Sequence, residues 1–126
     1  MITGIGTDIV EVGRIARLWR DKAEAFAARV FTDAELAYCL ARPHPEQHLA
    51  ARFAAKEAAL KALGTGWAKG LGFDEIEVVR DEASGATSLR FHGHALAAFK
   101  KSGATKSHVS LSHTDTLATA TVVLET

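Results

Sequence analysis

The sequence predicts an α+β fold, with most of the helix in the first half of the chain and most of the strand in the second. Apolar residues recur at helical intervals over residues 12–30 and 45–63. Residues 117–124 instead alternate small apolar residues with threonines, as one strand of a half-buried sheet does. Because 126 residues are the length of one ordinary domain, we expect residues 1–126 to form a single domain.

The first segment, residues 1–10, is rich in β-forming residues and contains Gly4 and Gly6. Glycines inside a strand predict that another segment approaches its backbone closely. The helical pattern over residues 12–30 is irregular, so we expect one broken helix or two short ones there.

Two helix starts follow. Thr32 precedes Glu35 by three residues, which is the spacing of a capping box, and it predicts a helix of about ten residues. Pro45 suits the first turn of the main helix, and Gly64 suits its C-terminal cap. This alanine-rich segment is the strongest single element of the sequence.

The second half of the chain alternates strands and turns. After a glycine-rich loop we expect a strand around Ile76, a hairpin turn at residues 84–85 with a second strand behind it, and a short helix over 95–101. Two antiparallel strands, 107–112 and 117–124, should close the chain about a short turn.

Composition and charge exclude several classes of protein. The chain has 15 Lys+Arg and 15 Asp+Glu, which argues against a dedicated binder of nucleic acid or anionic membranes. Its apolar runs are shorter than the roughly 20 residues of a membrane-spanning helix. The single cysteine, Cys39, excludes an intramolecular disulfide and is expected to be a small core residue. No secretory signal pattern is present, so we expect a cytoplasmic protein without nucleic-acid or membrane partners.

Charged residues interrupt the apolar stripe of the main helix. The stripe runs from Leu49 to Leu63, with Lys56 inside it and Glu57 at its flank. Since an unpaired buried charge is costly, these two residues form a structural ion pair, extend their stems to solvent or belong to a functional site. A surface pair of Glu57 with Lys61, worth about 0.3–0.5 kcal/mol, would not account for Lys56.

Asp8 lies at the expected end of the first strand, where an acidic residue either closes a turn or holds a metal. Mg²⁺ takes oxygen ligands and often only one or two carboxylates, with phosphates and water completing its shell. If Asp8 meets Glu57, the pair suits Mg²⁺, and Arg52, Lys56 and Lys61 suit phosphate oxygens. We therefore take a magnesium and phosphate site as a hypothesis.

Other patterns do not carry chemistry. The Gly-x-Gly of the first strand lacks the third glycine of a dinucleotide-binding loop, and the later glycines follow a helix rather than open one. Ser112 and His113 should point to opposite faces of a strand, which argues against a triad with Asp115. His92 and His94 lack an evident third ligand, so zinc is disfavoured.

Three separated segments resemble one known family: GIGTDIVEVGRI, RFAAKEAALKALGTG, and HVSLSHT before a final AxAxVVLE strand. In this order they resemble the holo-acyl-carrier-protein synthases, the small bacterial 4'-phosphopantetheinyl transferases, over nearly the whole chain. The resemblance implies an α+β homotrimer that binds coenzyme A between neighbouring subunits. It also implies Mg²⁺-dependent transfer of phosphopantetheine to a serine of apo-acyl carrier protein in fatty acid biosynthesis, which releases adenosine 3',5'-bisphosphate. The nucleophile would then belong to the partner.

The resemblance assigns roles to individual residues. Asp8 and Glu57 match the Mg²⁺ ligands, and together with Lys61 they would form the catalytic group. The expected coenzyme A contacts are Arg52, Lys56, Lys61, Gly64, Thr65, Gly66, Ser112 and His113. Two alternatives stay open: the general base is Glu57 or a metal-bound water, and Lys56 either contacts phosphate or pairs with Glu57.

A basic segment is expected to dock the carrier protein. Residues 12–30 hold five basic and two acidic residues, which would steer an acidic partner. Arg14 matches the family's docking position, and Arg17 and Arg20 match it more loosely. For Arg17 and Arg20, an ordinary solvated helix face is the alternative.

Two rival functions would use the same residues or the same ligand. One is a Mg²⁺-dependent phosphohydrolase that uses Asp8 and Glu57 with water as the acceptor. The other is a coenzyme A or nucleotide-binding module without transfer. The product formed from coenzyme A and apo-carrier protein separates all three.

Overall fold

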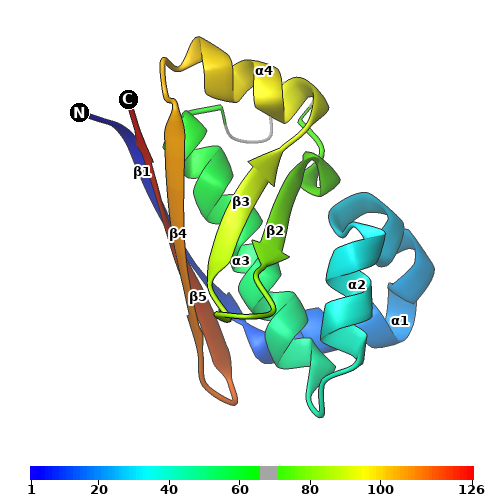
Figure 1. Cartoon of the computed structure of the whole chain (residues 1–126). Coiled ribbons are helices and arrows are strands. Elements are labelled where there is room, and N and C mark those ends of the chain that lie inside the picture. Colours follow the sequence, from blue (N-terminus) through cyan, green and yellow to red (C-terminus); the bar gives the residue numbers. More distant parts are fainter. Residues whose placement is uncertain (66–70) are drawn as a thin grey trace.

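The computed structural model describes residues 1–65 and 71–126 and confirms the α+β class (Figure 1). The chain begins with a strand and three helices, continues through a hairpin and a fourth helix, and ends in two strands. In chain order the elements are β1 (Ile2–Glu11), α1 (Val12–Val30), α2 (Asp33–Leu40), α3 (Pro45–Leu63), the 3-10 turn η1 (Phe73–Glu75), β2 (Ile76–Arg80), β3 (Thr87–Phe91), α4 (Gly93–Lys101), β4 (Lys106–His113) and β5 (Leu117–Glu125).

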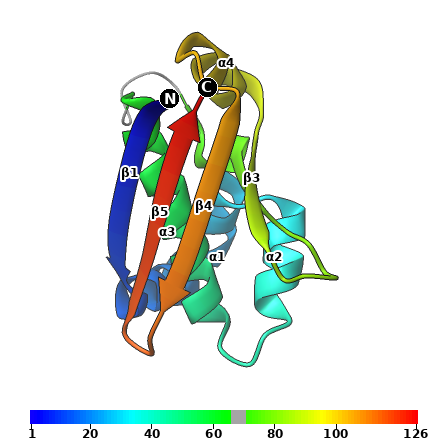
Figure 2. The ribbon, with the colours of Figure 1, turned by 60° about the vertical axis from the view of Figure 1, so that its left-hand side comes forward.

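The main sheet has three antiparallel strands in the order β1-β5-β4, so the first and last strands of the chain lie side by side (Figure 2). Its register places Asp8 opposite Ala120, and Ala120 opposite Leu111. The expected closing hairpin is confirmed as β4 and β5, with the backbone N–H of Thr114 donating to the Leu117 carbonyl oxygen at 2.8 Å. β2 and β3 form a separate two-stranded sheet.

Helix α3 is the centre of the molecule. It packs on the sheet through β1 and β5, and α1, α2 and β2 contact its other sides (Figure 1). All seven of its alanines are buried. Because these side chains are small, neighbouring segments pack close to the helix around most of its circumference. The prediction of one apolar stripe was therefore too narrow, because a helix covered on most sides needs small residues all round.

The close approach predicted from the glycines of the first strand is confirmed. Gly4 and Gly6 lie on the face of β1 that meets α3. A Cβ at Gly6 would lie 2.0 Å from the carbonyl oxygen of Ala58, and a Cβ at Gly4 would lie 2.1 Å from that of Ala62. The backbones of strand and helix thus touch directly.

The predicted helix ends are confirmed. Thr32 and Glu35 form the reciprocal capping box of α2, which has eight residues rather than about ten. Gly64 ends α3 in the left-handed conformation, with φ of 74°. The expected break in the first helix is a kink at Lys22, whose φ of −142° is not helical.

Cys39 is fully buried, and this burial raises the pKa of its thiol to about 11, so the prediction of a core residue is confirmed. Among the helices of the described residues, none is long and apolar enough to cross a membrane.

Candidate active site

Asp8 and Lys61 meet at the contact between β1 and α3. The Lys61 ammonium donates to Asp8 Oδ1 at 3.1 Å and to the carbonyl oxygen of Thr7 at 2.9 Å. Asp8 belongs to the face of β1 that also carries the two glycines, so its short side chain points toward the helix. The strand-end acid and the helix cation, which are 53 residues apart, are thus brought together.

Glu57 belongs to the same group. Its burial raises the pKa of its carboxyl and the charge of Asp8 raises it further, while the cations Lys61 and Arg14 pull it down. The net shift is upward, because burial and a second carboxylate both disfavour the charged form. Glu57 therefore lies within electrostatic reach of Asp8, as the sequence hypothesis required.

This pair fits a magnesium ion. Both side chains offer carboxylate oxygens, the ligand type that Mg²⁺ prefers, and two carboxylates are enough when phosphates and water complete the octahedron. Within residues 1–65 and 71–126, no three His, Cys, Asp or Glu side chains gather as a metal cage. His92 and His94 instead contact Glu77 and Glu75.

Lys56 does not belong to this site. Its ammonium is fully buried and donates to Glu35 Oε1 at 2.8 Å and to the carbonyl oxygens of Phe73 and Ile76 at 3.0 and 2.7 Å. With three donors used in the core, Lys56 cannot reach a phosphate. Both expectations for Lys56, phosphate contact and pairing with Glu57, were wrong; the residue forms a structural ion pair with Glu35.

Arg52 also lies away from Glu57. The two residues are five positions apart on α3, which separates them by about 140° around the axis. Arg52 is 4% exposed, and its guanidinium carbon lies 4.3 Å from the centre of the Tyr38 ring. Of the three cations expected to hold phosphates, Arg52, Lys56 and Lys61, only Lys61 reaches Asp8, and the coenzyme A contact of Arg52 stays a prediction. Arg52 Nε has no hydrogen-bond partner among the described residues.

His113 and Ser112 lie at the end of β4, two strands from Asp8, so their backbones are about 10 Å from it. The His113 ring contacts the His48 ring of α3, with ring centres 5.3 Å apart. Ser112, its neighbour in the strand, is exposed, and its side chain belongs to the opposite face of the sheet. His48, Tyr38 and Arg52 thus form a second cluster with His113, at a distance from Asp8.

The loop after α3 is only partly described. Gly64 and Thr65 line a groove of about 360 Å³ between the end of α3 and α4. The hydroxyl oxygen of Thr65 is buried without a hydrogen-bond partner in the described part of the chain. Gly66, the third expected residue of this loop, lies outside the described residues.

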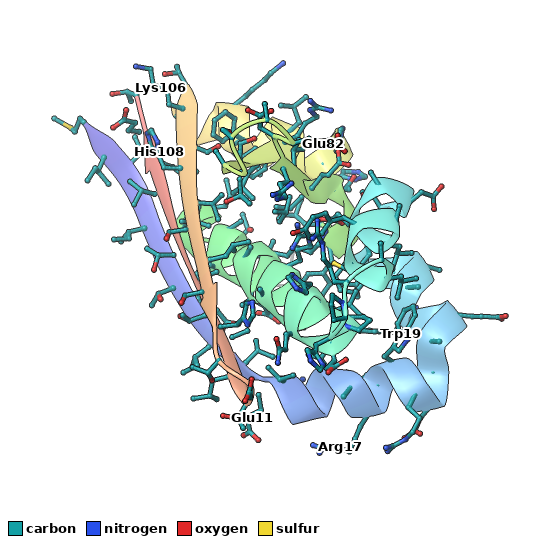
Figure 3. All side chains as sticks on the ribbon, turned by 60° about the horizontal axis from the view of Figure 1, so that its bottom comes forward. Glu11, Arg17, Trp19, Glu82, Lys106 and His108 are labelled. Carbon is teal, nitrogen blue, oxygen red and sulfur yellow. The ribbon has the colours of Figure 1, made fainter. Side chains whose placement is uncertain are left out.

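The three arginines expected to dock a carrier protein differ in their surroundings. Arg14 lines an apolar groove of about 310 Å³ between α1 and α3, together with Leu18 and Phe53. Arg17 projects from α1 into solvent (Figure 3). Arg20 pairs with Asp21 at 3.1 Å, and both side chains are exposed.

Two residues of these clusters were missed at the sequence level. Glu35 was recognised as a helix cap, but nothing in its spacing signals that it also neutralises Lys56. Tyr38 carries no charge or motif, and only the fold brings its ring under the guanidinium of Arg52.

Residues 4–122 match the family model of the 4'-phosphopantetheinyl transferase superfamily, which defines the class of protein to which this fold and site belong. The holo-[acyl-carrier-protein] synthase of Koribacter versatilis is 44% identical over 125 residues, 99% of each chain. The crystal structure of the synthase from Neisseria meningitidis has 38% identity, a TM-score of 0.87 and full coverage of both chains. The synthase from Bacillus anthracis, solved in complex with CoA (3',5'-ADP), has 34% identity, a TM-score of 0.79 and coverage of 100% and 98%. The chain belongs to the holo-[acyl-carrier-protein] synthase family and is a phosphopantetheinyl transferase.

Proposed function

We propose that Asp8, Glu57 and Lys61 form the catalytic group of this transferase and that Asp8 and Glu57 hold Mg²⁺. The reaction moves the 4'-phosphopantetheine group from coenzyme A to a serine of apo-acyl carrier protein, for fatty acid biosynthesis. The observation that carries the assignment is the hydrogen bond of Lys61 to Asp8 at the contact of β1 and α3, with Glu57 within electrostatic reach of Asp8.

In this proposal, the bond from the serine oxygen to the β-phosphorus of coenzyme A forms as the bond to the leaving adenosine 3',5'-bisphosphate breaks. Lys61 turns its ammonium from Asp8 to a phosphate oxygen, because its side chain is half exposed and flexible. The serine proton goes to a general base, for which Glu57 and a water molecule beside the metal are the two candidates. Bound Mg²⁺ would supply charge neutralisation at the pyrophosphate.

We further propose that the molecule is a homotrimer with coenzyme A bound between subunits. Ile5 and Ile9, on the outer face of β1, are 66% and 65% exposed, which is unusual for large apolar side chains and supports burial against another copy. Arg52 and His113, two of the expected coenzyme A contacts, lie away from Asp8 in the same chain. A coenzyme A molecule that touched both clusters would be accommodated by two neighbouring subunits.

For the carrier protein, we propose docking along α1. Arg14 has two connections that suit this role: it lines the apolar groove, and its charge acts on the Glu57 carboxyl. A carrier held at Arg14 would therefore bring its serine beside the catalytic group. Arg17 and Arg20 would add longer-range attraction for an acidic partner.

Residues 1–126 would form one domain, since the buried apolar residues that the structure describes belong to one cluster. A single buried thiol suits a reducing cytoplasm, where we expect the enzyme to act.

Mass spectrometry of apo-carrier protein tests the function. The carrier should gain the mass of one phosphopantetheine group only when coenzyme A and Mg²⁺ are both present. Free phosphate or free phosphopantetheine without modified carrier would instead indicate a phosphohydrolase. If no product formed at all, the protein would be a binding module without transfer activity. Glu57→Gln should abolish the metal-dependent gain and leave the fold intact, whereas Glu46→Gln, on the first turn of the same helix, should leave it unchanged.

A further inference from the structure

Beside the candidate metal ligands, β1 and α3 contact each other through backbone atoms, with no side chain between them at Gly6. A Cβ at Gly6 would lie 2.0 Å from the oxygen of Ala58 and 2.8 Å from the nitrogen of Ala62, whereas real Cβ contacts essentially never fall below 3.0 Å. The obstructing atoms belong to the backbone of a buried helix, so they cannot swing aside as the end of a long side chain can. A methyl group at position 6 must therefore push the strand and the helix apart.

Backbone conformation does not explain this glycine. Four other glycines of the described residues have positive φ, but Gly4 and Gly6 are not among them. Both lie in extended strand, which any residue can adopt. The closeness of α3 is thus the feature that requires glycine here.

The catalytic group adjoins this contact along both segments. Asp8 follows Gly6 by two residues, so both face α3. Glu57 and Lys61 each directly precede one of the two alanines that Gly6 would strike. Any change in the gap between strand and helix is therefore transmitted to the separation of the Asp8 and Glu57 carboxylates.

We propose that Gly6 is a positioning residue, whose lack of a side chain sets the separation of the Asp8 and Glu57 carboxylates to the size of Mg²⁺. The proposal rests on the proposed role of these two residues as ligands. Mg²⁺ demands near-ideal geometry with ligands at about 2.0–2.1 Å, whereas Ca²⁺ accepts about 2.3–2.6 Å and flexible geometry. A wider gap should therefore weaken Mg²⁺ binding more than Ca²⁺ binding.

The test is calorimetric titration of the full chain with Mg²⁺ and, separately, with Ca²⁺. In Gly6→Ala, the methyl group separates the two backbones by at least about 1 Å, and we expect Mg²⁺ affinity to fall about tenfold or more, with a smaller loss for Ca²⁺. The ratio of the two affinities is the decisive readout, because a general loss of stability would not change it.

Gly4→Ala is the matched control. Its Cβ would meet the Ala62 oxygen at 2.1 Å, nearly the same clash, but it lies four residues before Asp8 instead of two. We expect a similar loss of thermal stability with the wild-type ratio of Mg²⁺ to Ca²⁺ affinity. An equal change of the ratio in both variants would overturn a specific role for Gly6.

A longer ligand provides a rescue. Asp8→Glu adds one methylene, which should crowd Mg²⁺ in the wild-type gap and restore its binding in the widened gap of Gly6→Ala. If the losses of Mg²⁺ affinity in the two single variants simply added in the double variant, the proposal would be contradicted. If Gly6→Ala does not fold, Asp8→Glu alone decides, because unchanged Mg²⁺ binding would show that the gap is not tightly set.

Glu57→Gln in the same titration separates the two proposals. A strong loss of Mg²⁺ affinity in Glu57→Gln with an unchanged ratio in Gly6→Ala would overturn only the positioning role. Wild-type Mg²⁺ affinity in Glu57→Gln would overturn the ligand assignment itself, and the positioning role with it.

Discussion

Lys56 and Glu35 form an ion pair at 2.8 Å whose side chains are both completely buried. The pair joins α2 to α3, and the second oxygen of Glu35 accepts from the backbone N–H of Val78 in β2 at 2.8 Å. Burial alone lowers the pKa of Lys56, and the charge of Glu35 opposes that shift. Lys56, which directly precedes the proposed magnesium ligand Glu57 in the sequence, thus stabilises the core.

Because of this ion pair, we expect Lys56 to contribute to the stability of the fold. Lys56→Met should lower the free energy of unfolding by about 3–5 kcal/mol, because it leaves the Glu35 carboxylate buried without a counter-charge. Urea denaturation measures the change. Lys61→Met, which breaks the partly exposed pair with Asp8 on the same helix, should cost no more than about 1 kcal/mol. Equal losses in the two variants would contradict the structural role of Lys56.

Arg14→Glu should raise the KM for carrier protein and leave coenzyme A affinity close to that of the wild type. The reason is that Arg14 lines the groove on α1 and a reversed charge would repel an acidic partner. Steady-state kinetics with each substrate varied in turn measures both. Arg20→Glu is the control, since Arg20 already pairs with Asp21, and its effect should be smaller. Equal damage to both substrates in Arg14→Glu would place Arg14 in the nucleotide site.

The stability of the fold should fall in acid through Glu75 and Glu77. Burial raises the pKa of each carboxyl, but hydrogen bonds outweigh burial and hold both pKa values below their ordinary level. The Glu75 carboxyl accepts from the backbone N–H groups of Gly72 and His94. The Glu77 carboxyl is hydrogen-bonded to the side chains of His92 and Thr32.

The unfolded chain therefore binds these protons at higher pH than the folded chain does. The stabilisation is complete above the ordinary glutamate pKa of about 4.3 and is lost as the pH falls through the lower folded values. Chemical denaturation at several pH values measures this slope. Glu75→Gln should make the free energy of unfolding less dependent on pH. Replacing Glu82, which is exposed on the hairpin (Figure 3), should not change that dependence.

Ile9→Glu should dissociate the proposed trimer. A charge at this exposed position of the outer sheet face is harmless to an isolated chain but would be desolvated in an interface. Light scattering coupled to size exclusion measures the mass, and Thr105→Glu, an exposed position next to β4, is the control. A trimer that persists in Ile9→Glu would exclude this face as the interface.

Much of the fold could be predicted locally. The capping box of Thr32 and Glu35, the end of α3 at Gly64 and the closing hairpin follow from interactions within a few residues of the chain. The close approach at Gly6 was also predictable, because a glycine inside a strand is unfavourable unless another segment needs the space. The family resemblance indicated Asp8 and Glu57 as partners in a metal site, and the contact between β1 and α3 is what brings the two carboxyls within electrostatic reach of each other.

The sequence by itself determined the class of fold, its helix caps and the residue types from which a magnesium and phosphate site can be built. Only the tertiary structure decided which charged residues lie beside Asp8 and which are buried in the core. Lys56 and Lys61 are similar in sequence, five residues apart on one helix, but one meets Glu35 in the core and the other meets Asp8 near solvent. The physical reason is that a lysine's role is set by the nearest carboxylate in space, and the chain separation of these partners, 21 and 53 residues, puts both beyond any local pattern.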